Sequence, residues 1–411
     1  MQTPKFFNRL RSRTGIIAVS VFLNFSGFTL IIPVLPFSVG RYVSDHDVAL
    51  NVSLIIATFA LCSFVAAPVL GAFSDRFGRR PVLLLSLLGS AVGFAVFGVG
   101  GALGVLFLGR IIEGLTAGSI SAMYAYVADT HAPEERGPAY GMLGAAGGLG
   151  FMLGPVAGGL LGQISLSAPL YVAAAVAVLN AVWVYFSVPE SLPPEKRAAR
   201  LHPAEFNSIV QLSAVLADGR LRGIFIAAFL FFGAATLMQS NVSVLLKDLL
   251  NFNSAAIGLT LLGVGLMDIL SQGIAAPKLL PRFGERRVAI AGLIINGLGF
   301  ALYALLAFAP SLPLLVAAVF VFTFGDGLFQ PSSNTMISHA APDGQQGRVQ
   351  GANQAQQSIA RMIGPLASAW LYGLSAAGPY IAGGMIVLAG AALLSSLRTH
   401  RVPSAKVSEA H

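Results

Sequence analysis

The chain has 411 residues, of which 55% are hydrophobic and only 10% are charged, and its net charge is +8. Soluble globular proteins carry about 25% charged residues, so this composition excludes a water-soluble fold. It predicts an all-α integral membrane protein, because a helix in a bilayer satisfies its own backbone polar groups and shows apolar side chains to the lipid.

The single cysteine, Cys62, excludes a disulfide framework and a thiolate metal cluster, and no metal site is expected. No lysine follows a glycine-rich loop in the manner of a nucleotide-binding loop. No catalytic cluster of Ser, His and Asp stands out in the apolar segments, so an enzyme is not expected. We expect no cofactor, and any uphill movement of a ligand would draw on an ion gradient.

Hydropathy predicts twelve membrane-spanning helices, because a hydrocarbon core of roughly 30 Å requires about 20 apolar residues per helix. The first is too long for the core of a signal peptide and is taken as a retained helix. In chain order the predicted spans are 14–37, 50–73, 81–100, 103–127, 139–163, 167–188, 222–246, 255–277, 288–309, 312–337, 349–374 and 377–397.

The basic residues gather on one side of this topology. Of the 25 Lys and Arg residues, all but four fall before the first span, after the last, or in every second loop. The exceptions are Arg41, Arg110, Lys247 and Arg361. Cytoplasmic loops carry the excess of Lys and Arg, so both termini are predicted in the cytoplasm. The positive charge is then explained by topology, and no nucleic-acid partner is expected.

An internal repeat divides the chain into two related halves. Because each half has an even number of spans, the two six-helix repeats are parallel. The predicted domains are 1–188 and 222–411, joined by a cytoplasmic linker over 189–221. The matches are Arg76-Phe77-Gly78 with Arg282-Phe283-Gly284 at an offset of 206, and Gly137, Gly141, Gly154 and Pro155 with Gly347, Gly351, Gly364 and Pro365 at an offset of 210.

The turn between the second and third spans carries the strongest local motif, Gly71 to Pro81. It combines a glycine that permits a tight turn with one carboxylate and three guanidinium groups. It resembles the loop signature G-x-x-x-D-R-x-G-R-R of the major facilitator superfamily, although a short loop with cytoplasmic positive charge is the simpler interpretation.

That resemblance implies a twelve-helix transporter fold and a gate at this turn. Asp75 would dock against a neighbouring helix start, and Arg79 would pair with Asp129 and latch the cytoplasmic side closed. The residues implied in this cytoplasmic gate are Gly71, Asp75, Arg76, Gly78, Arg79, Arg80 and Asp129.

The fifth span resembles the helix-five signature G-x-x-x-G-P-x-x-G-G of antiporters in the same superfamily. The matching residues are Gly150, Gly154, Pro155, Gly158 and Gly159. Small residues at this spacing also permit close helix packing, and a proline bends a helix, so a purely structural role stays open.

The whole first half resembles the tetracycline efflux proteins, and the second half resembles them more loosely. The stretches that carry the resemblance are 32–36, 75–85, 109–112, 126–129, 135–136 and 284–287, with the pair Gly364-Pro365. The chain departs from their pattern at Asn24, Gly93, Asp268 and Asn296. The resemblance therefore implies the fold and the antiport class, and tetracycline is not carried over as the substrate.

Five charged residues lie inside predicted spans: Arg110, Glu113, Asp268, Asp326 and Arg361. A charge at the bilayer centre costs about 3 kcal/mol on insertion scales, so each requires an explanation. Arg110 and Glu113 share one helix face and, with Gly114, match the family's signature in this helix. They are either a static ion pair or a proton site. Asp326 pairs with Arg361 if the tenth and eleventh spans face each other, whereas Asp268 has no evident partner.

The proton-coupling candidates are therefore Arg110, Glu113, Asp268 and Asp326. Polar residues at other positions in the spans are candidates for a substrate cavity, although each also suits a hydrogen-bonded cross-link between helices. They are Asn24, Gln239, Asn241, Gln272, Gln330, Asn334, Gln357 and Arg361.

Taken together, the resemblance implies proton-coupled efflux of hydrophobic or amphiphilic, drug-like small molecules across the inner (plasma) membrane by alternating access. The expected partners are a small-molecule substrate, protons and the lipid bilayer, and a monomer is expected. A sugar or metabolite exporter and an uptake symporter are alternatives of the same fold. A membrane sensor without transport is a more remote alternative, since the longest loop, 189–221, is too short for a soluble domain.

Overall fold

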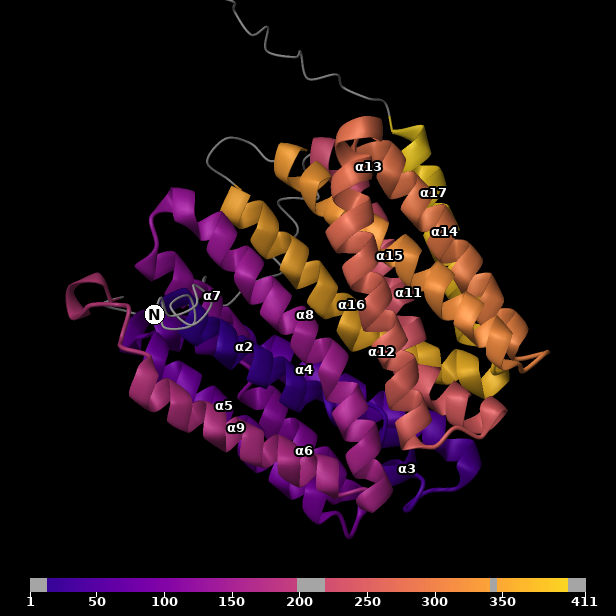
Figure 1. Cartoon of the computed structure of the whole chain (residues 1–411), viewed down its shortest axis with the longest axis horizontal. Helices are drawn as coiled ribbons and strands as arrows, with labels where there is room; N and C mark the ends of the chain where they lie inside the picture. Colours follow the sequence, from indigo (N-terminus) through magenta and orange to yellow (C-terminus); the bar gives the residue numbers. More distant parts are fainter. Residues whose placement is uncertain (1–12, 198–218, 341–345, 398–411) are drawn as a thin grey trace, which may run out of the picture.

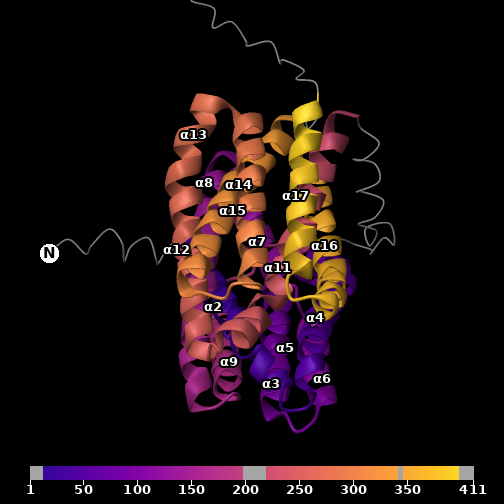
Figure 2. The same ribbon diagram turned by 90° about the vertical axis from the view of Figure 1, so that its right-hand side faces the viewer.

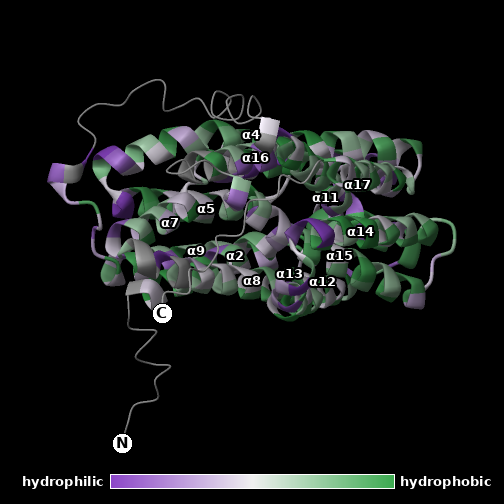
Figure 3. Cartoon of the chain, turned by 90° about the horizontal axis from the view of Figure 1, so that it is seen from above, coloured by the Kyte–Doolittle hydropathy of each residue, from purple (hydrophilic) through white to green (hydrophobic). Residues whose placement is uncertain are grey.

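The computed structural model describes residues 13–197, 219–340 and 346–397, and these residues form helices joined by short connections (Figure 1). The helices run roughly parallel to one another (Figure 2). Hydrophobic residues cover most of their length, while hydrophilic residues lie near the helix ends and along part of α16 (Figure 3). This is the pattern expected of a bundle surrounded by lipid.

The first half supplies the first six spans. Its helices are α2 (Arg13–Thr29), α3 (Leu35–Val39), α4 (Asp45–Phe77), α5 (Arg79–Val99), α6 (Leu103–Leu115), α7 (Ser119–Thr130), α8 (Pro133–Ile164) and α9 (Ala168–Ser187). Two predicted spans are interrupted. The first breaks into α2 and α3, where Pro36 lies in the first turn of the new helix. The fourth breaks at Thr116, whose hydroxyl donates back to the carbonyl of Ile112 at 2.9 Å.

The second half supplies the other six spans. Its helices are α11 (Gly219–Leu250), α12 (Ser254–Leu270), α13 (Ala276–Phe283), α14 (Glu285–Leu306), α15 (Leu312–Ala340), α16 (Gln346–Leu374) and α17 (Gly378–Ser396). A π-helical turn, Ser271–Ala275, joins α12 to α13 and lengthens the eighth span beyond its prediction. The Ser271 hydroxyl donates to the carbonyl of Met267 at 2.8 Å, which helps to bend the helix there.

Twelve spans follow from these elements, as predicted. Ten described segments are long and apolar enough to cross a membrane, among them α6–α7 and α12–α13 taken as single spans. The other two are α2, whose apolar part Thr14–Thr29 is short, and α16, which begins with a run of Gln and Asn. A polar helix in this position faces protein rather than lipid, because lipid offers its side chains no partners.

Helix packing repeats between the halves. In the first half α2 packs on α8, and α5 packs on α6 and α9. In the second half α11 packs on α16, and α14 packs on α15 and α17, so the equivalent helices meet in the same order. This is the arrangement expected of a parallel repeat. The domain limits at 188 and 222 stay predictions, and residues 198–218 of the predicted linker lie outside the described residues.

The two halves meet along α8–α12 and α4–α16. We name the two ends of the molecule by residues: the Asp45 end, where α4 begins, and the Arg79 end, where α4 turns into α5. Contacts between halves at the Asp45 end include Lys247 with Asp45 at 3.5 Å and the Ser254 hydroxyl with the carbonyl of Gly159 at 2.9 Å.

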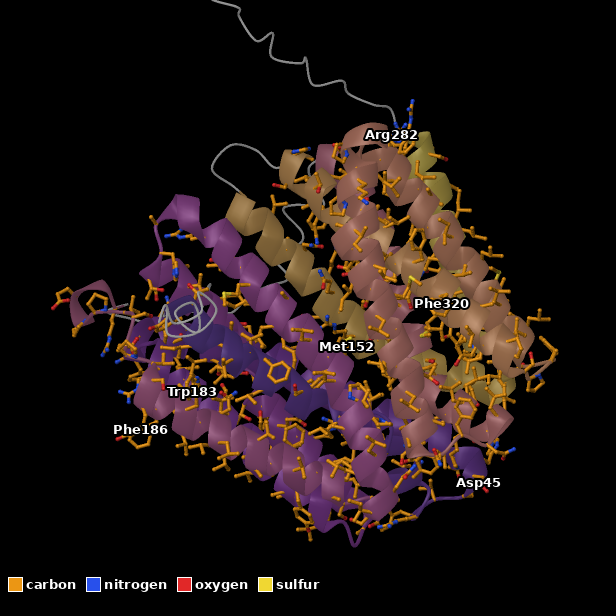
Figure 4. The ribbon with its side chains drawn as sticks, viewed as in Figure 1. Asp45, Met152, Trp183, Phe186, Arg282 and Phe320 are labelled. Carbon is orange, nitrogen blue, oxygen red and sulfur yellow. The ribbon has the colours of Figure 1, made fainter. Side chains whose placement is uncertain are left out.

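Toward the Arg79 end the halves draw apart. α8 packs on α12, whereas its packing does not extend along α13 among the described residues. Phe186, at the end of α9, and Arg282, at the end of α13, lie wide apart, while Met152 lies where α8 crosses α12 (Figure 4). The molecule is therefore closed at the Asp45 end and splayed at the Arg79 end.

We call the contact between α8 and α12 the seam, and we predict that Gly258→Ala destabilises it. A Cβ at Gly258 would lie 2.4 Å from the carbonyl oxygen of Pro155, a backbone atom that cannot turn away. Overpacking of this kind costs about 1–3 kcal/mol. Gly263→Ala is the matched control, because its Cβ would meet only Val319 at 3.9 Å, and alanine gains about 1 kcal/mol of helix propensity. Thermal unfolding of the two purified variants measures both effects; equal midpoints would contradict the prediction.

Candidate functional site

The gate residues at the Arg79 end form one hydrogen-bonded group. The Nε of Arg79 lies 2.8 Å from Asp129 at the end of α7, so the expected ion pair is present. The same guanidinium binds Asp75 and, at 3.1 Å, the hydroxyl of Ser74. Asp75 thus contacts the first residue of α5, although its side chain stays 55% exposed. The group joins three helices of the first half, and no described residue of the second half takes part in it.

The other gate residues lie around the same turn. Gly78 has φ +106°, a conformation that an L-residue rarely adopts, so the turn requires glycine here. The Arg80 guanidinium donates to the carbonyl of Tyr185 and lies 4.9 Å from the centre of that ring. Arg76 is exposed. Gly71 and Asp75 line a cavity of about 230 Å³ between α4, α5 and α7.

Glu190, which follows α9, is absent from the sequence predictions and contacts two of the predicted gate residues. Its carboxylate accepts from the backbone N–H groups of Arg79 at 2.8 Å and Arg80 at 3.2 Å. The signal in the sequence is its position just beyond a span, on the same side of the membrane as the basic turn. Its spacing from Arg79 does not predict the contact, because the two residues lie far apart in the sequence.

The Arg110–Glu113 pair is enclosed within the first half. The guanidinium and carboxylate are 2.5 Å apart, and both side chains are buried. The guanidinium also lies 5.5–6.0 Å from the ring centres of Phe28, Phe59 and Phe97, on three different helices. Aromatic faces stabilise a cation that is cut off from water. The arrangement suits an ion pair in which both groups stay charged although they are buried away from water.

The two acids of the second half lie on helices that pack together. Asp268 on α12 and Asp326 on α15 stand halfway along their spans, and beside them Gly327 packs against Ser271 and Gln272. Each carboxylate accepts from a glutamine four residues later: Gln272 at 3.2 Å and Gln330 at 3.1 Å. The π-helical turn begins just after Asp268, and such turns are frequent at functional sites.

The expected pairing of Asp326 with Arg361 is wrong. No ion pair joins them in the described part of the chain. The reason is packing: α15 lies mainly against α14 and α12 and touches α16 only slightly, and Asp326 accepts from Gln330 instead. Arg361 is exposed.

Most predicted cavity residues are accessible, and one is not. Asn241 is fully buried, accepts from Ser53 at 3.3 Å and donates to Ser368 at 2.9 Å, so its prediction as a cavity residue is wrong: it cross-links the two halves. Asn24 donates to Ser119 at 3.0 Å and is partly buried. The residues that stay exposed or half-buried are Gln239, Gln272, Gln330, Asn334, Gln357 and Arg361.

The glycines of the fifth span have a packing role. A Cβ at Gly154 would lie 2.0 Å from the Thr29 hydroxyl, and one at Gly158 would lie 2.0 Å from the carbonyl of Leu30. Gly150 faces α2 in the same way, and Gly159 faces the carbonyl of Ser254 across the seam. These contacts support the structural interpretation of the motif; a further antiport role stays a prediction.

A twelve-span helical protein with two parallel halves, a seam at one end and carboxylates in mid-span is a membrane transporter. The family model of the Major Facilitator Superfamily matches residues 17–280 and 224–411. The chain is 34% identical over 375 residues to the tetracycline resistance protein, class C, of Escherichia coli, covering 89% of this chain and 92% of that protein. It is 29% identical over 397 residues to multidrug resistance protein 2 of Bacillus subtilis (strain 168), covering 95% and 96%.

Solved structures agree. The crystal structure of the human organic anion transporter MFSD10 (TETRAN) matches with a TM-score of 0.73 at 26% identity, covering 96% of this chain and 100% of that chain. The chain therefore belongs to the major facilitator superfamily, and it is a transporter of small molecules in the inner membrane rather than an enzyme. The predicted family and fold are confirmed.

We predict that Glu113→Gln strongly destabilises the protein, because it leaves the buried Arg110 charge without its counter-ion. Removing one partner of a buried ion pair costs about 3–5 kcal/mol. The double variant Arg110→Met/Glu113→Leu removes both charges and should recover most of the loss. Thermal unfolding in detergent compares the three proteins. A Glu113→Gln variant as stable as the parent would show that Arg110 does not depend on this carboxylate.

Proposed function

We propose that the protein exports hydrophobic or amphiphilic, drug-like small molecules in exchange for protons, by alternating access. Its relatives include proteins named for tetracycline resistance and multidrug resistance. The seam at one end and the splay at the other suit two halves that rock against each other around a site at the bilayer midplane.

The Asp268–Asp326 pair is the observation that carries proton coupling. A carboxyl group halfway across a membrane favours its neutral form, because removal from water disfavours the charge, so these acids can hold a proton and exchange it. The pair lies halfway along its spans, beside Gln272, which is exposed. A substrate arriving at this wall would displace the proton, and reprotonation from the other side would release the substrate. The enclosed Arg110–Glu113 pair is less suited to this exchange because its charges already neutralise each other.

The basic residues support an orientation for this exchange. Arg76, Arg79 and Arg80 lie at the Arg79 end, and the excess of Lys and Arg in every second loop favours a cytoplasmic location for this end and both termini. The splayed end then opens inward, and the exposed or half-buried polar residues form the wall of the substrate path: Gln239, Gln272, Gln330, Asn334, Gln357 and Arg361. The gate group, formed within the first half, is poised at the mouth of this path. The protein needs only the proton gradient as an energy source and works as a monomer.

Proton release on drug binding tests this function. Purified protein in weak buffer is mixed with lipophilic cations, tetracyclines, quinolones and, separately, sugars. We expect the drugs to release protons, because they displace a proton that these acids hold. Asp268→Asn and Asp326→Asn should each reduce the release, because each removes one of the two mid-span carboxyl groups that can hold the exchanging proton.

Asp45→Asn is the control, because Asp45 is 97% exposed at the closed end and should release protons like the parent. Binding of a sugar without proton release from any drug would overturn the proposal in favour of a sugar or metabolite transporter. Release that persists undiminished in both aspartate variants would move proton coupling to another group.

A further inference from the structure

We propose that Glu190 is a positioning residue of the gate, which holds the Arg79 turn in place and fastens to it the segment that leads into the second half. The Oε1 of Glu190 accepts three backbone N–H groups: Arg79 at 2.8 Å, Ser191 at 2.9 Å and Leu192 at 3.0 Å. Its Oε2 accepts a fourth from Arg80 at 3.2 Å.

These contacts supply a missing helix cap. The first N–H groups of a helix have no partner within it, and at the start of α5 the N-cap residue is Gly78, which has no side chain to offer. Glu190 fills this position from another segment. A carboxylate is the group best suited to it, because it meets the positive end of the helix dipole and accepts charge-assisted hydrogen bonds.

Gly78 makes room for this carboxylate. A Cβ at Gly78 would lie 2.3 Å from the Oε2 of Glu190 and 2.6 Å from its Cδ. The equivalent residue of the second half, Gly284, also has a positive φ of +79°, yet no described atom lies within 4 Å of its Cβ position. The two turns therefore share a backbone conformation, and the carboxylate contact distinguishes the first from the second.

Glu190 also balances the charge of the gate. The turn carries Arg76, Arg79 and Arg80, and among the described side chains Asp75 and Asp129 form ion pairs with Arg79. Glu190 is the third carboxylate, and the adjacent Ser191 hydroxyl donates to Asp129 at 3.0 Å. The ends of α4, α7 and α9 and the start of α5 are thereby joined into one unit.

The consequence for transport rests on the proposed alternating access. The segment after α9 leads toward the second half, so the point at which it leaves the first half is fixed at the gate itself. Glu190 is remote from the mid-span acids, and its loss should therefore slow the conformational cycle without weakening substrate binding.

Hydrogen exchange tests the contact independently of transport. We expect the backbone amides of Arg79 and Arg80 to be protected in the parent, and to exchange at least about tenfold faster in Glu190→Ala. At Arg79, Glu190→Gln should stay near the parent, because its amide oxygen can still accept the three shorter bonds, whereas Arg80 should exchange faster because an NH2 group replaces its acceptor. The turn at Gly284 is an internal control and should be unchanged in both variants. Equal exchange at Arg79 in all three proteins would overturn the proposal.

Transport kinetics test the role. In Glu190→Ala we expect the maximal rate to fall about tenfold, as for the loss of charge-assisted hydrogen bonds, with KM unchanged. Glu190→Gln should keep most of the rate, and Glu195→Gln, which removes the same charge from an exposed residue nearby, should match the parent. Equal losses in Glu190→Gln and Glu190→Ala, or a parental rate in Glu190→Ala, would overturn the positioning role. The exchange experiment needs no substrate, so it stands even if the proposed drug–proton exchange is wrong.

Discussion

The halves come closest where the carbonyl of Pro155 faces Gly258 and the carbonyl of Ser254 faces Gly159. These are contacts between backbone and backbone, and they leave no space for a side chain on either helix. Within a membrane, helix association depends on such close packing and on a few hydrogen bonds, since lipid is as apolar as the helices. Because this seam lies toward the Asp45 end, the halves are held at one end and free to part at the other. The splay at the Arg79 end and the accessible polar residues in mid-span both follow from the position of the seam.

The two halves use charge in different ways. The first half neutralises its buried charges in place: Arg110 is paired with Glu113 and surrounded by three phenylalanine rings. The second half brings together two acids, Asp268 and Asp326, and gives each only a neutral glutamine. An ion pair of opposite charges needs no further partner. Two acids need a bound proton or a ligand to offset their negative charge. The two halves therefore share their helix packing and differ in how the charged residues in mid-span are partnered.

The sequence predicts where the spans lie, but it does not predict which residues of different spans contact each other. Hydropathy located all twelve spans because each must cross the same thickness of hydrocarbon. It did not locate the break after α2, the break at Thr116 or the π-helical turn, which depend on prolines and on hydroxyls that compete for backbone carbonyls. The ion pair of Arg79 with Asp129 was found through a family resemblance rather than through spacing.

Residues that meet across helices were the hardest to predict. Asp326 was assigned to Arg361 because their charges are opposite, but α15 touches α16 only slightly and Asp326 accepts from Gln330 instead. Asn241 was assigned to a cavity because it is polar, but it is fully buried between Ser53 and Ser368. The contacts of Glu190 are not predicted because it binds backbone N–H groups, which nearly every residue has and which the sequence therefore does not distinguish. In each case the deciding fact was which helix faces which, and a linear pattern does not contain it.

The predicted gate of the first half and the equivalent turn of the second half show what the repeat preserves and what it changes. Arg79 and Asp129 recur as Glu285 and His339, at the same offsets of 206 and 210 that relate the other repeated motifs. The second pair is also in contact, at 3.3 Å, with the signs of the charges exchanged. Its geometry is thus inherited, but its strength is not: the first pair is largely shielded, whereas the side chains of His339 and Glu285 are 67% and 37% exposed, and His339 attracts its partner only when protonated. Exposed pairs contribute little. At the Arg79 end the first half therefore holds its turn by a shielded ion pair, whereas the equivalent pair of the second half adds little to the stability of its turn.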